Sequence, residues 1–183
     1  MRIVINKNDR RISLLVEGYP RLGFQLYSRL LKTGVEGVCV SRMHPEYVMQ
    51  KYDLPEARCF RLSSCKGKDV MQPKVLSQVS KSLRGAIKEG KETAVFLDGL
   101  EYLLLYNDLN KVMGFLRDME ASLLKQNAEM LVSIDPLTFE QRDLDQLFSV
   151  FPRLKAEELS AMLPSSQPQQ SVAAAPLSVG QTV

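Results

Sequence analysis

Gly18 and Gly23 lie five residues apart, after an apolar segment (Ile12 to Val16) and before an amphipathic segment that begins at Phe24. A strand, a glycine turn and a helix in this order form phosphate-binding loops, in which backbone amides and the helix N-terminus hold the phosphates. Such a loop continues with a lysine that neutralises the phosphates and a serine or threonine that holds Mg²⁺. Here Phe24 and Gln25 occupy these two positions. The sequence therefore predicts either a nucleotide site without its chemistry or, more simply, an ordinary turn between a strand and a helix.

A second motif is the segment TAVFLD at positions 93 to 98, a predicted apolar strand that ends in Asp98. At the carboxyl edge of a parallel sheet, such a carboxylate can hold Mg²⁺ and a nearby glutamate can orient an attacking water. Asp98 and Glu101 are placed for these roles, and Asp135 follows the next predicted strand. The simpler alternative is that Asp98 ends the strand and forms a turn with Gly99, because aspartate and glycine favour turns.

The composition indicates one soluble domain with a real core, since the 183 residues are 45% hydrophobic and 25% charged. No apolar run approaches the roughly 18 to 20 residues of a membrane span. The first seven residues lack the long apolar stretch and the cleavage site of a signal peptide. We therefore expect a cytoplasmic chain that makes no membrane contact.

Cysteine and histidine are too few to predict a metal site. The spacing from Cys59 to Cys65 is too long for a zinc knuckle, and His44 is the only histidine. Cys39 and Cys59 fall in predicted strands, where a reduced thiol packs as a small hydrophobic group. We expect structural thiols, no metal and no cofactor, and a single histidine gives triad catalysis little support.

Charge is unevenly distributed along the chain, although the net charge is only +3. Positions 58 to 91 hold nine basic residues and two acidic ones, whereas positions 98 to 158 hold twelve acidic and six basic residues. Lys81, Arg84 and Lys88 share one face of a predicted helix. That face is either a solvated helix surface or a surface for a protein partner. Nucleic acid is not the expected partner, because the rest of the chain is near neutral or acidic.

Short apolar segments alternate with amphipathic ones, which is typical of a three-layer α/β/α fold with a mainly parallel sheet. The predicted strands are 12–16, 35–41, 58–62, 93–97 and 129–134, with 2–5 considered as an edge strand. Helices are predicted after Gly23, from Pro73 as a first helical position, from Asp108 as a cap to Asn127, and after Pro136.

The chain is divided into a domain at residues 1–163 and a tail at residues 164–183. Apolar residues within 155–163 are predicted either to cap the core or to form a small exposed surface. The tail carries no charge and few large apolar side chains. Because such a segment cannot offset the entropy of ordering it, we predict a flexible tail.

Three blocks resemble the signature of a known family: GVEGVCVSRMHP at 34–45, FLDGLEYL at 96–103 and VSIDP at 132–136. Over roughly residues 12 to 151 the chain is similar to an archaeal family known as domain of unknown function 835. Such domains are often appended to PAS, receiver or kinase modules, which implies signalling. The layout also resembles RecA/KaiC-type ATPases, which implies a P-loop scaffold with a degenerate Walker A loop and a Walker B strand that ends at Asp98.

The leading hypothesis is a noncatalytic signalling or adaptor module, a pseudo-ATPase that acts through a protein partner or as a homo-oligomer. The aromatic ring of Phe24 removes the neutralising cation and intrudes where the terminal phosphate would sit, and Gln25 is a poor anchor for Mg²⁺. Nucleotide binding is therefore expected to be weak or absent. The candidate partner-binding residues are Arg42, Lys81, Arg84 and Lys88.

The rival hypothesis is a nucleotide sensor or weak nucleotidase that keeps Asp98 and Glu101 and borrows a cation from elsewhere. Arg21 and Arg42 are the candidates for that cation. Arg42 directly follows a predicted strand and can point over the ligand edge. The simpler alternative is a surface arginine that pairs with Glu46 or Asp135. The most useful observation is whether the pocket between Gly18, Asp98 and Asp135 is open or filled by Phe24.

Overall fold

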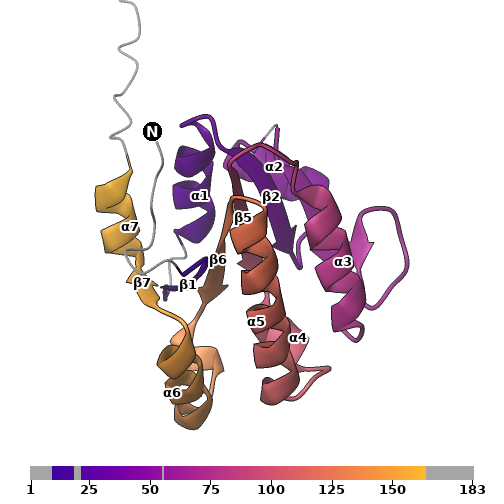
Figure 1. Ribbon diagram of the computed structural model, residues 1–183, viewed down its shortest axis with the longest axis vertical. Helices are drawn as coiled ribbons and strands as arrows, with labels where there is room; N and C mark the ends of the chain where they lie inside the picture. The colour runs from indigo at the N-terminus through magenta and orange to yellow at the C-terminus, as the bar shows by residue number, and fades with distance from the viewer. Residues whose placement is uncertain (1–9, 19–21, 55, 164–183) are drawn as a thin grey trace, which may run out of the picture.

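A seven-stranded sheet forms the centre of the molecule and carries helices on both faces (Figure 1). The computed structural model describes residues 10–18, 22–54 and 56–163. Within these residues the strand order is β4-β3-β2-β5-β6-β1-β7 and every neighbouring pair is parallel, which confirms the predicted α/β class. The strands are β1 (Ile12–Val16), β2 (Glu36–Ser41), β3 (Arg58–Leu62), β4 (Val70–Met71), β5 (Thr93–Asp98), β6 (Ala128–Ile134) and β7 (Arg153–Lys155).

The central strand β5 shows why the strands of this sheet have continuous apolar sequences. All six of its residues are buried. Val95 and Leu97 belong to the core on one face of the sheet, whereas Ala94 and Phe96 belong to the core on the other. Because successive side chains of a strand point to opposite faces, a strand covered on both sides must be apolar at nearly every position.

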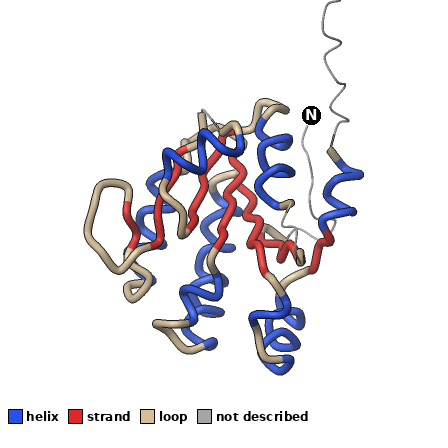
Figure 2. Tube along the Cα trace, turned by 180° about the vertical axis from the view of Figure 1, so that it is seen from behind, coloured by secondary structure: helices blue, strands red, loops and turns tan. Residues whose placement is uncertain are grey.

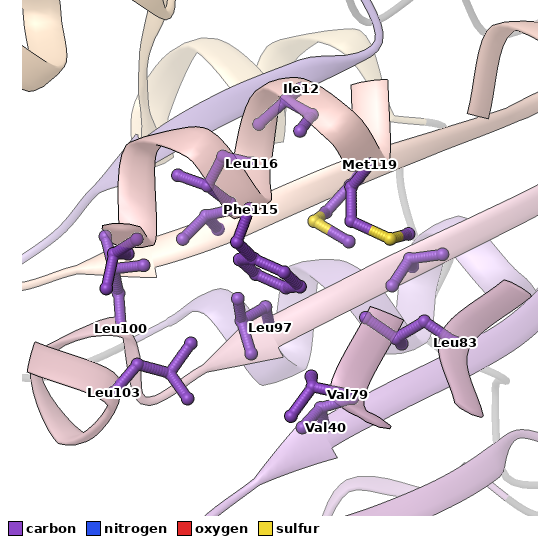
Figure 3. Packing of buried hydrophobic residues seen from close by; sticks show 14 of the residues in the cluster. Ile12, Val40, Val79, Leu83, Leu97, Leu100, Leu103, Phe115, Leu116 and Met119 are labelled. Carbon is purple, nitrogen blue, oxygen red and sulfur yellow. The ribbon is translucent and has the colours of Figure 1, made fainter. Parts of the chain in front are cut away.

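Two groups of helices supply these two cores (Figure 2). One face is covered by α3 (Leu76–Ala86), α4 (Leu100–Leu104), α5 (Leu109–Lys125) and α6 (Gln141–Val150). The other is covered by α1 (Gly23–Leu31), α2 (Pro45–Tyr52) and α7 (Ala156–Met162). Figure 3 shows side chains from α3, α4 and α5, among them Val79, Leu103 and Phe115, gathered around Val40 and Leu97 of the sheet.

The carboxyl ends of all strands meet at one edge of the sheet, because the strands are parallel. This edge lies toward the lower part of Figure 1, where α4 and α6 are found. After β2 the chain enters α2 on one face, and after the neighbouring β5 it enters α4 on the other. The neighbours β1 and β6 separate in the same way, into α1 and α6. Ligands of open parallel sheets bind in crevices at such switch points, so this edge has two places where a site can form.

Most strand predictions are confirmed within one residue. The bounds of β1 and β3 are as predicted, and those of β2, β5 and β6 differ by one residue at one end. Sequence reasoning missed β4 and β7, which have only two and three residues and therefore show no periodicity. The considered strand at 2–5, the candidate cation Arg21 and the predicted tail at 164–183 lie outside the described residues.

The helix predictions need one correction. The helix expected to begin at Pro73 begins at Leu76, because a turn closed by the Val75 N–H and the Gln72 carbonyl oxygen (3.2 Å) comes first. Asp108 caps α5 as predicted: its Oδ1 accepts from the Lys111 N–H at 2.9 Å.

The short helices α2, α4 and α7 were not predicted. Near the C-terminus, Leu159 and Leu163 are buried in the core, whereas Met162 is 44% exposed. Residues 155–163 therefore contribute both to the core and, through Met162, to the exposed surface, so each of the two predicted alternatives holds in part. No helix in the described part of the chain is long and apolar enough to cross a bilayer.

Candidate functional site

The crevice between β1 and β6 is closed by the side chain of Glu17, the residue that follows β1. Its carboxylate Oε2 accepts hydrogen bonds from the backbone N–H groups of Leu22 (2.8 Å) and Gly23 (2.6 Å) at the start of α1. Oε1 accepts a hydrogen bond from the Ser133 hydroxyl at the end of β6. Glu17 is only 6% exposed. The first amides of α1, which attract anions, are thus satisfied by an anion that belongs to the chain itself.

Gly23 is required at this position by close packing. A Cβ atom there would lie 2.5 Å from Oε1 of Glu17 and 2.9 Å from Cζ of Phe96, so no larger residue fits without a shift. Gly18, in contrast, is exposed and would meet no atom within 4 Å. The two glycines of the predicted loop therefore have different roles, and the first of them is not held by packing.

Phe24, at the position of the missing lysine, belongs to the core. Its ring stacks on that of Tyr52 (centroids 4.4 Å apart, 10° between the planes) and meets Phe96 edge to face at 4.9 Å. Phe24 is 7% exposed, whereas the neighbouring Gln25 points to solvent. From the sequence, we expected the ring of Phe24 to obstruct the position of the terminal phosphate. The group that contacts the α1 amides is Glu17, which no motif of a nucleotide site would have identified.

The crevice between β2 and β5 contains the predicted acidic residues. Oδ2 of Asp98 accepts a hydrogen bond from the Ser41 hydroxyl at 3.0 Å, and the Ser41 hydroxyl oxygen accepts one from the Met43 N–H at 3.1 Å. Arg42 pairs with Glu101 at 3.4 Å. The predicted alternative partners of Arg42, Glu46 and Asp135, are therefore wrong. The arginine side chain remains 49% exposed, and that of Glu101 is 19% exposed.

A cavity of about 440 Å³ lies in this second crevice. Among the described residues it is lined by Phe24, Arg42, Met43, Tyr52 and Asp98. Asp98 itself is 5% exposed. The space beside Asp98 is thus open, and Phe24 forms part of its wall. The volume is within the range of roughly 300 to 1,000 Å³ that is usual for small-molecule sites.

The structure brings together only some of the predicted site residues. Phe24 and Asp98 share the open cavity with Arg42, and Glu101 reaches that group through its ion pair. Asp135 instead caps the 3-10 helix η1 (Pro136–Thr138), where its Oδ1 accepts from the Leu137 N–H at 3.0 Å. Its role in the described structure is local.

Lys81 and Arg84 of α3 are exposed, as is Lys88 just beyond the helix. Lys88 pairs with Glu36 at 2.8 Å. For Lys81 and Arg84, no carboxylate of the described residues lies within ion-pair distance. The basic face predicted on this helix is therefore present and only partly neutralised.

Two of the three cysteines are packed in the core. Cys39 and Cys59 are buried and lie directly opposite each other in the register of β2 and β3. A hydrogen bond with Cys59, together with burial, raises the pKa of the Cys39 thiol well above its usual range, which disfavours the reactive thiolate. Cys65 is exposed. In the described ranges, no cluster of three His, Cys, Asp or Glu side chains is suited to hold a metal ion.

A comparison with protein families identifies the chain. The profile of the family described as "Protein of unknown function (DUF835)" matches residues 21–151, well over half of the chain. The chain belongs to the DUF835 family. No curated protein matches it. The DUF835 match includes the five described residues that line the open cavity, whereas Glu17, which closes the other crevice, precedes it.

Proposed function

We propose that this DUF835 protein is a noncatalytic signalling or adaptor module of the cytoplasm, which acts through protein contacts on a degenerate RecA/KaiC-like ATPase scaffold. The order of elements supports the scaffold: β1 leads through the glycine turn into α1, β5 ends at Asp98, and β6 lies between β1 and β5 in the sheet. The fold would then be that of a nucleotide hydrolase from which the chemistry has been lost.

One observation carries this proposal: the carboxylate of Glu17 occupies the amides at the start of α1. A P-loop offers these amides to a phosphate, assisted by a lysine. Here the amides already hold a negative charge, the lysine position carries the buried ring of Phe24, and the hydroxyl position carries Gln25. A phosphate would have to displace a buried carboxylate from the three hydrogen bonds that it makes with described residues, without any cation at the lysine position to compensate.

The proposed protein contacts rest on the basic face of α3. Lys81 and Arg84 project from the helix into solvent, without an ion-pair partner among the described residues. An acidic surface of a partner protein, or of a second copy of the chain, complements such a face. This face is remote in sequence from the glycine turn, so partner binding and nucleotide binding are separable properties.

Calorimetric titration with ATP and Mg²⁺ tests the loss of the nucleotide site. We expect an affinity no tighter than millimolar and no release of phosphate. A micromolar affinity that depends on Mg²⁺ would overturn the proposal.

For the partner surface, Lys81→Glu with Arg84→Glu should abolish complex formation in pull-down and sedimentation experiments. The matched pair Arg117→Glu with Lys125→Glu, on exposed positions of α5, should leave it unchanged.

A nucleotide sensor is the second candidate, because the cavity beside Asp98 is open and contains Arg42. In that case the nucleotide would enter between β2 and β5 and would not use the amides of α1. Asp98 and Glu101 would then be the residues on which any Mg²⁺ dependence relies. Substitution of Asp98 by Asn would abolish the affinity in this case, whereas our proposal expects no affinity to abolish.

A further inference from the structure

Leu105 and Leu137 are the most exposed large apolar side chains in the described part of the chain. Leu105 is 75% exposed and Leu137 is 91% exposed, and no other large apolar side chain among the described residues is more than 55% exposed. Leu105 directly follows α4, which continues from β5, and Leu137 lies in η1, directly after β6. Because β5 and β6 are parallel neighbours, both leucines lie at the carboxyl edge of the sheet.

Leu105 is part of a larger apolar surface. Tyr102 and Tyr106 share its side of the helical turn, since residues three and four positions apart are neighbours on a helix. Their rings meet edge to face with centroids 5.4 Å apart, and both side chains are half-buried. Leu100 and Leu103 point the other way, into the core (Figure 3). We call Tyr102, Leu105 and Tyr106 the tyrosine patch, a composition that is enriched at protein interfaces.

The tyrosine patch offers a positive charge to a partner. Nζ of Lys74 lies 5.5 Å from the centroid of the Tyr106 ring, and Asn107 holds this segment in place by donating to the backbone carbonyl just before Lys74 (2.8 Å). Lys74 is exposed, and no carboxylate of the described residues lies within ion-pair distance of it. The acidic neighbours Glu101 and Asp108 are, in contrast, paired with basic side chains.

The surroundings of Leu137 have the opposite charge. Positions 135 to 145 hold four acidic residues and one basic residue. Glu140 is exposed, and no basic side chain of the described residues pairs with it. Asp135 fixes the turn, because its Oδ1 accepts from the Leu137 N–H at 3.0 Å. We call Asp135, Leu137 and Glu140 the acidic corner. It combines an apolar side chain with negative charge, and thus complements the tyrosine patch.

We propose that two copies of the chain form a two-fold dimer through the carboxyl edges of their sheets. Leu137 of each copy packs on the tyrosine patch of the other, and Glu140 faces Lys74. Since both surfaces lie on the same edge of one chain, a two-fold axis makes each contact twice and closes the assembly. Burial of the exposed leucines favours association, and the opposite charges fix which surfaces meet. A nucleic acid would match Lys74 but would leave Leu105 uncovered.

This inference rests on the proposed function, because it assigns a second copy of the chain as a partner. It uses a surface other than the basic face of α3. Lys88, just beyond α3, lies near the amino ends of the strands, since it pairs with Glu36, the first residue of β2. In the proposed dimer that face stays free for another protein, so Lys81→Glu with Arg84→Glu should dimerise normally. Dissociation of the dimer by this double variant would place the second copy on α3 and overturn the inference.

The two proposals can also fail separately. A micromolar, Mg²⁺-dependent affinity for ATP in a chain that dimerises as described would overturn the proposed function and leave this inference intact. Loss of another protein partner on substitution of Lys81 and Arg84, in a chain that stays monomeric, would support the function and overturn the inference.

Sedimentation equilibrium of the full chain provides the first test. We expect a reversible monomer–dimer equilibrium with a dissociation constant of about 10 to 100 μM, as befits a contact of modest area. A chain that remains monomeric up to about 1 mM would overturn the proposal. Larger assemblies that grow with concentration would show that the contacts do not close around a two-fold axis, and would overturn it as well.

Alanine variants test the apolar contacts. Leu105→Ala and Leu137→Ala should each weaken dimerisation at least about tenfold, because each substitution acts twice in a two-fold dimer. Leu124→Ala is the matched control: this leucine is also exposed, but it lies near the far end of α5 and should not affect dimerisation. The thermal midpoints of all three variants should stay close to that of the unaltered chain, since the side chains are exposed. Unchanged dimerisation of Leu105→Ala or Leu137→Ala would overturn the assigned interface.

An exchange of charges tests which surfaces meet. Lys74→Glu and Glu140→Lys should each dimerise at least about tenfold more weakly, because like charges then meet at both contacts. In a heterodimer of the two variants, one contact has the exchanged charges and the other the original ones, so both are again opposite. Native mass spectrometry of the mixture should show this heterodimer in preference to either homodimer. Arg117→Glu and Glu157→Lys, at exposed positions of α5 and α7, are the controls and should each dimerise normally. A mixture without preference for the heterodimer would show that Lys74 and Glu140 do not face each other, and would overturn the proposed pairing.

Discussion

The two crevices at the carboxyl edge of this sheet have the same topology but opposite contents. Between β1 and β6, the buried carboxylate of Glu17 binds Ser133 and the amides of Leu22 and Gly23. Between β2 and β5, Asp98 and Ser41 border a cavity of about 440 Å³. A parallel sheet therefore creates places for ligands, but the side chains that follow each strand decide whether a place is filled from within or left open.

The two crevices also differ from a P-loop site, in which the helix amides and an acidic residue at a strand end bind one ligand. In a nucleotide site, the helix amides and the acidic residue at the end of the second strand act on the same ligand. Here the amides are committed to Glu17, and Asp98 lines a separate open space with Arg42. In the proposed scaffold, the two parts of a nucleotide site would therefore no longer act on one ligand.

Phe24→Ala should have the largest effect, because the ring packs on Tyr52 and Phe96 beside both crevices. We expect a loss of about 4 kcal/mol in the free energy of unfolding, as is usual for removal of a buried phenylalanine. Chemical denaturation measures this loss, and Phe24→Leu should retain most of the stability. ATP affinity should remain millimolar or weaker in Phe24→Ala. Strong ATP binding would show that the ring, and not Glu17, excludes the nucleotide.

Glu17→Ala should destabilise the fold by about 3 kcal/mol, because it removes an ionised acceptor from buried donors. The amides of Leu22 and Gly23 and the Ser133 hydroxyl lose their shared partner. Millimolar sulfate should restore part of the loss, since an external anion can then occupy the vacated amides. Glu157→Ala, which removes an exposed carboxylate on α7, is the control. If Glu17→Ala has the same free energy of unfolding as the unaltered protein, and sulfate does not change it, this carboxylate does not hold the first crevice closed.

The serines of the two crevices allow a direct comparison. Ser133 donates to Glu17 and Ser41 donates to Asp98, and both hydroxyls are buried. We expect Ser133→Ala to cost about 2 kcal/mol and Ser41→Ala about 1 kcal/mol, since a hydrogen bond to a charged group is worth roughly 1.5 to 3 kcal/mol when nothing replaces it. Water from the open cavity can replace the bond to Asp98 but not the one to Glu17. Equal losses in the two variants would mean that both crevices are equally closed to water.

The sequence predicted the sheet well because its signal is local. Continuous apolar runs such as β5 are buried on both faces and appear as strands without any knowledge of their neighbours. The edge strands β4 and β7, with two and three residues, have no such signal. Pairing with β3 and β1 creates them, so they depend on the fold already being in place.

The site was less predictable, because its decisive contacts join distant residues. The motifs placed Asp98 at the end of a strand and the glycine turn before a helix, as the structure has them, but the contact of Glu17 with Ser133 spans 116 positions and matches no motif. Even the glutamate's position before the glycine turn gave no hint of its role, since a surface carboxylate would look the same. Likewise, the ion pair of Arg42 with Glu101 depends on how α4 begins after β5. Spacing places residues on elements, whereas the packing of elements decides which side chains meet.

Deletion of residues 164–183 should have the smallest effect of all. The described residues that build both crevices precede position 164, and the deleted segment carries no charge and few large apolar side chains. We expect the thermal midpoint to fall by less than about 4 °C, the shift that corresponds to roughly 1 to 2 kcal/mol in a chain of this size. Differential scanning calorimetry of the truncated and full chains measures it. A larger fall would show that the segment packs on the domain and that the domain extends to the end of the given sequence.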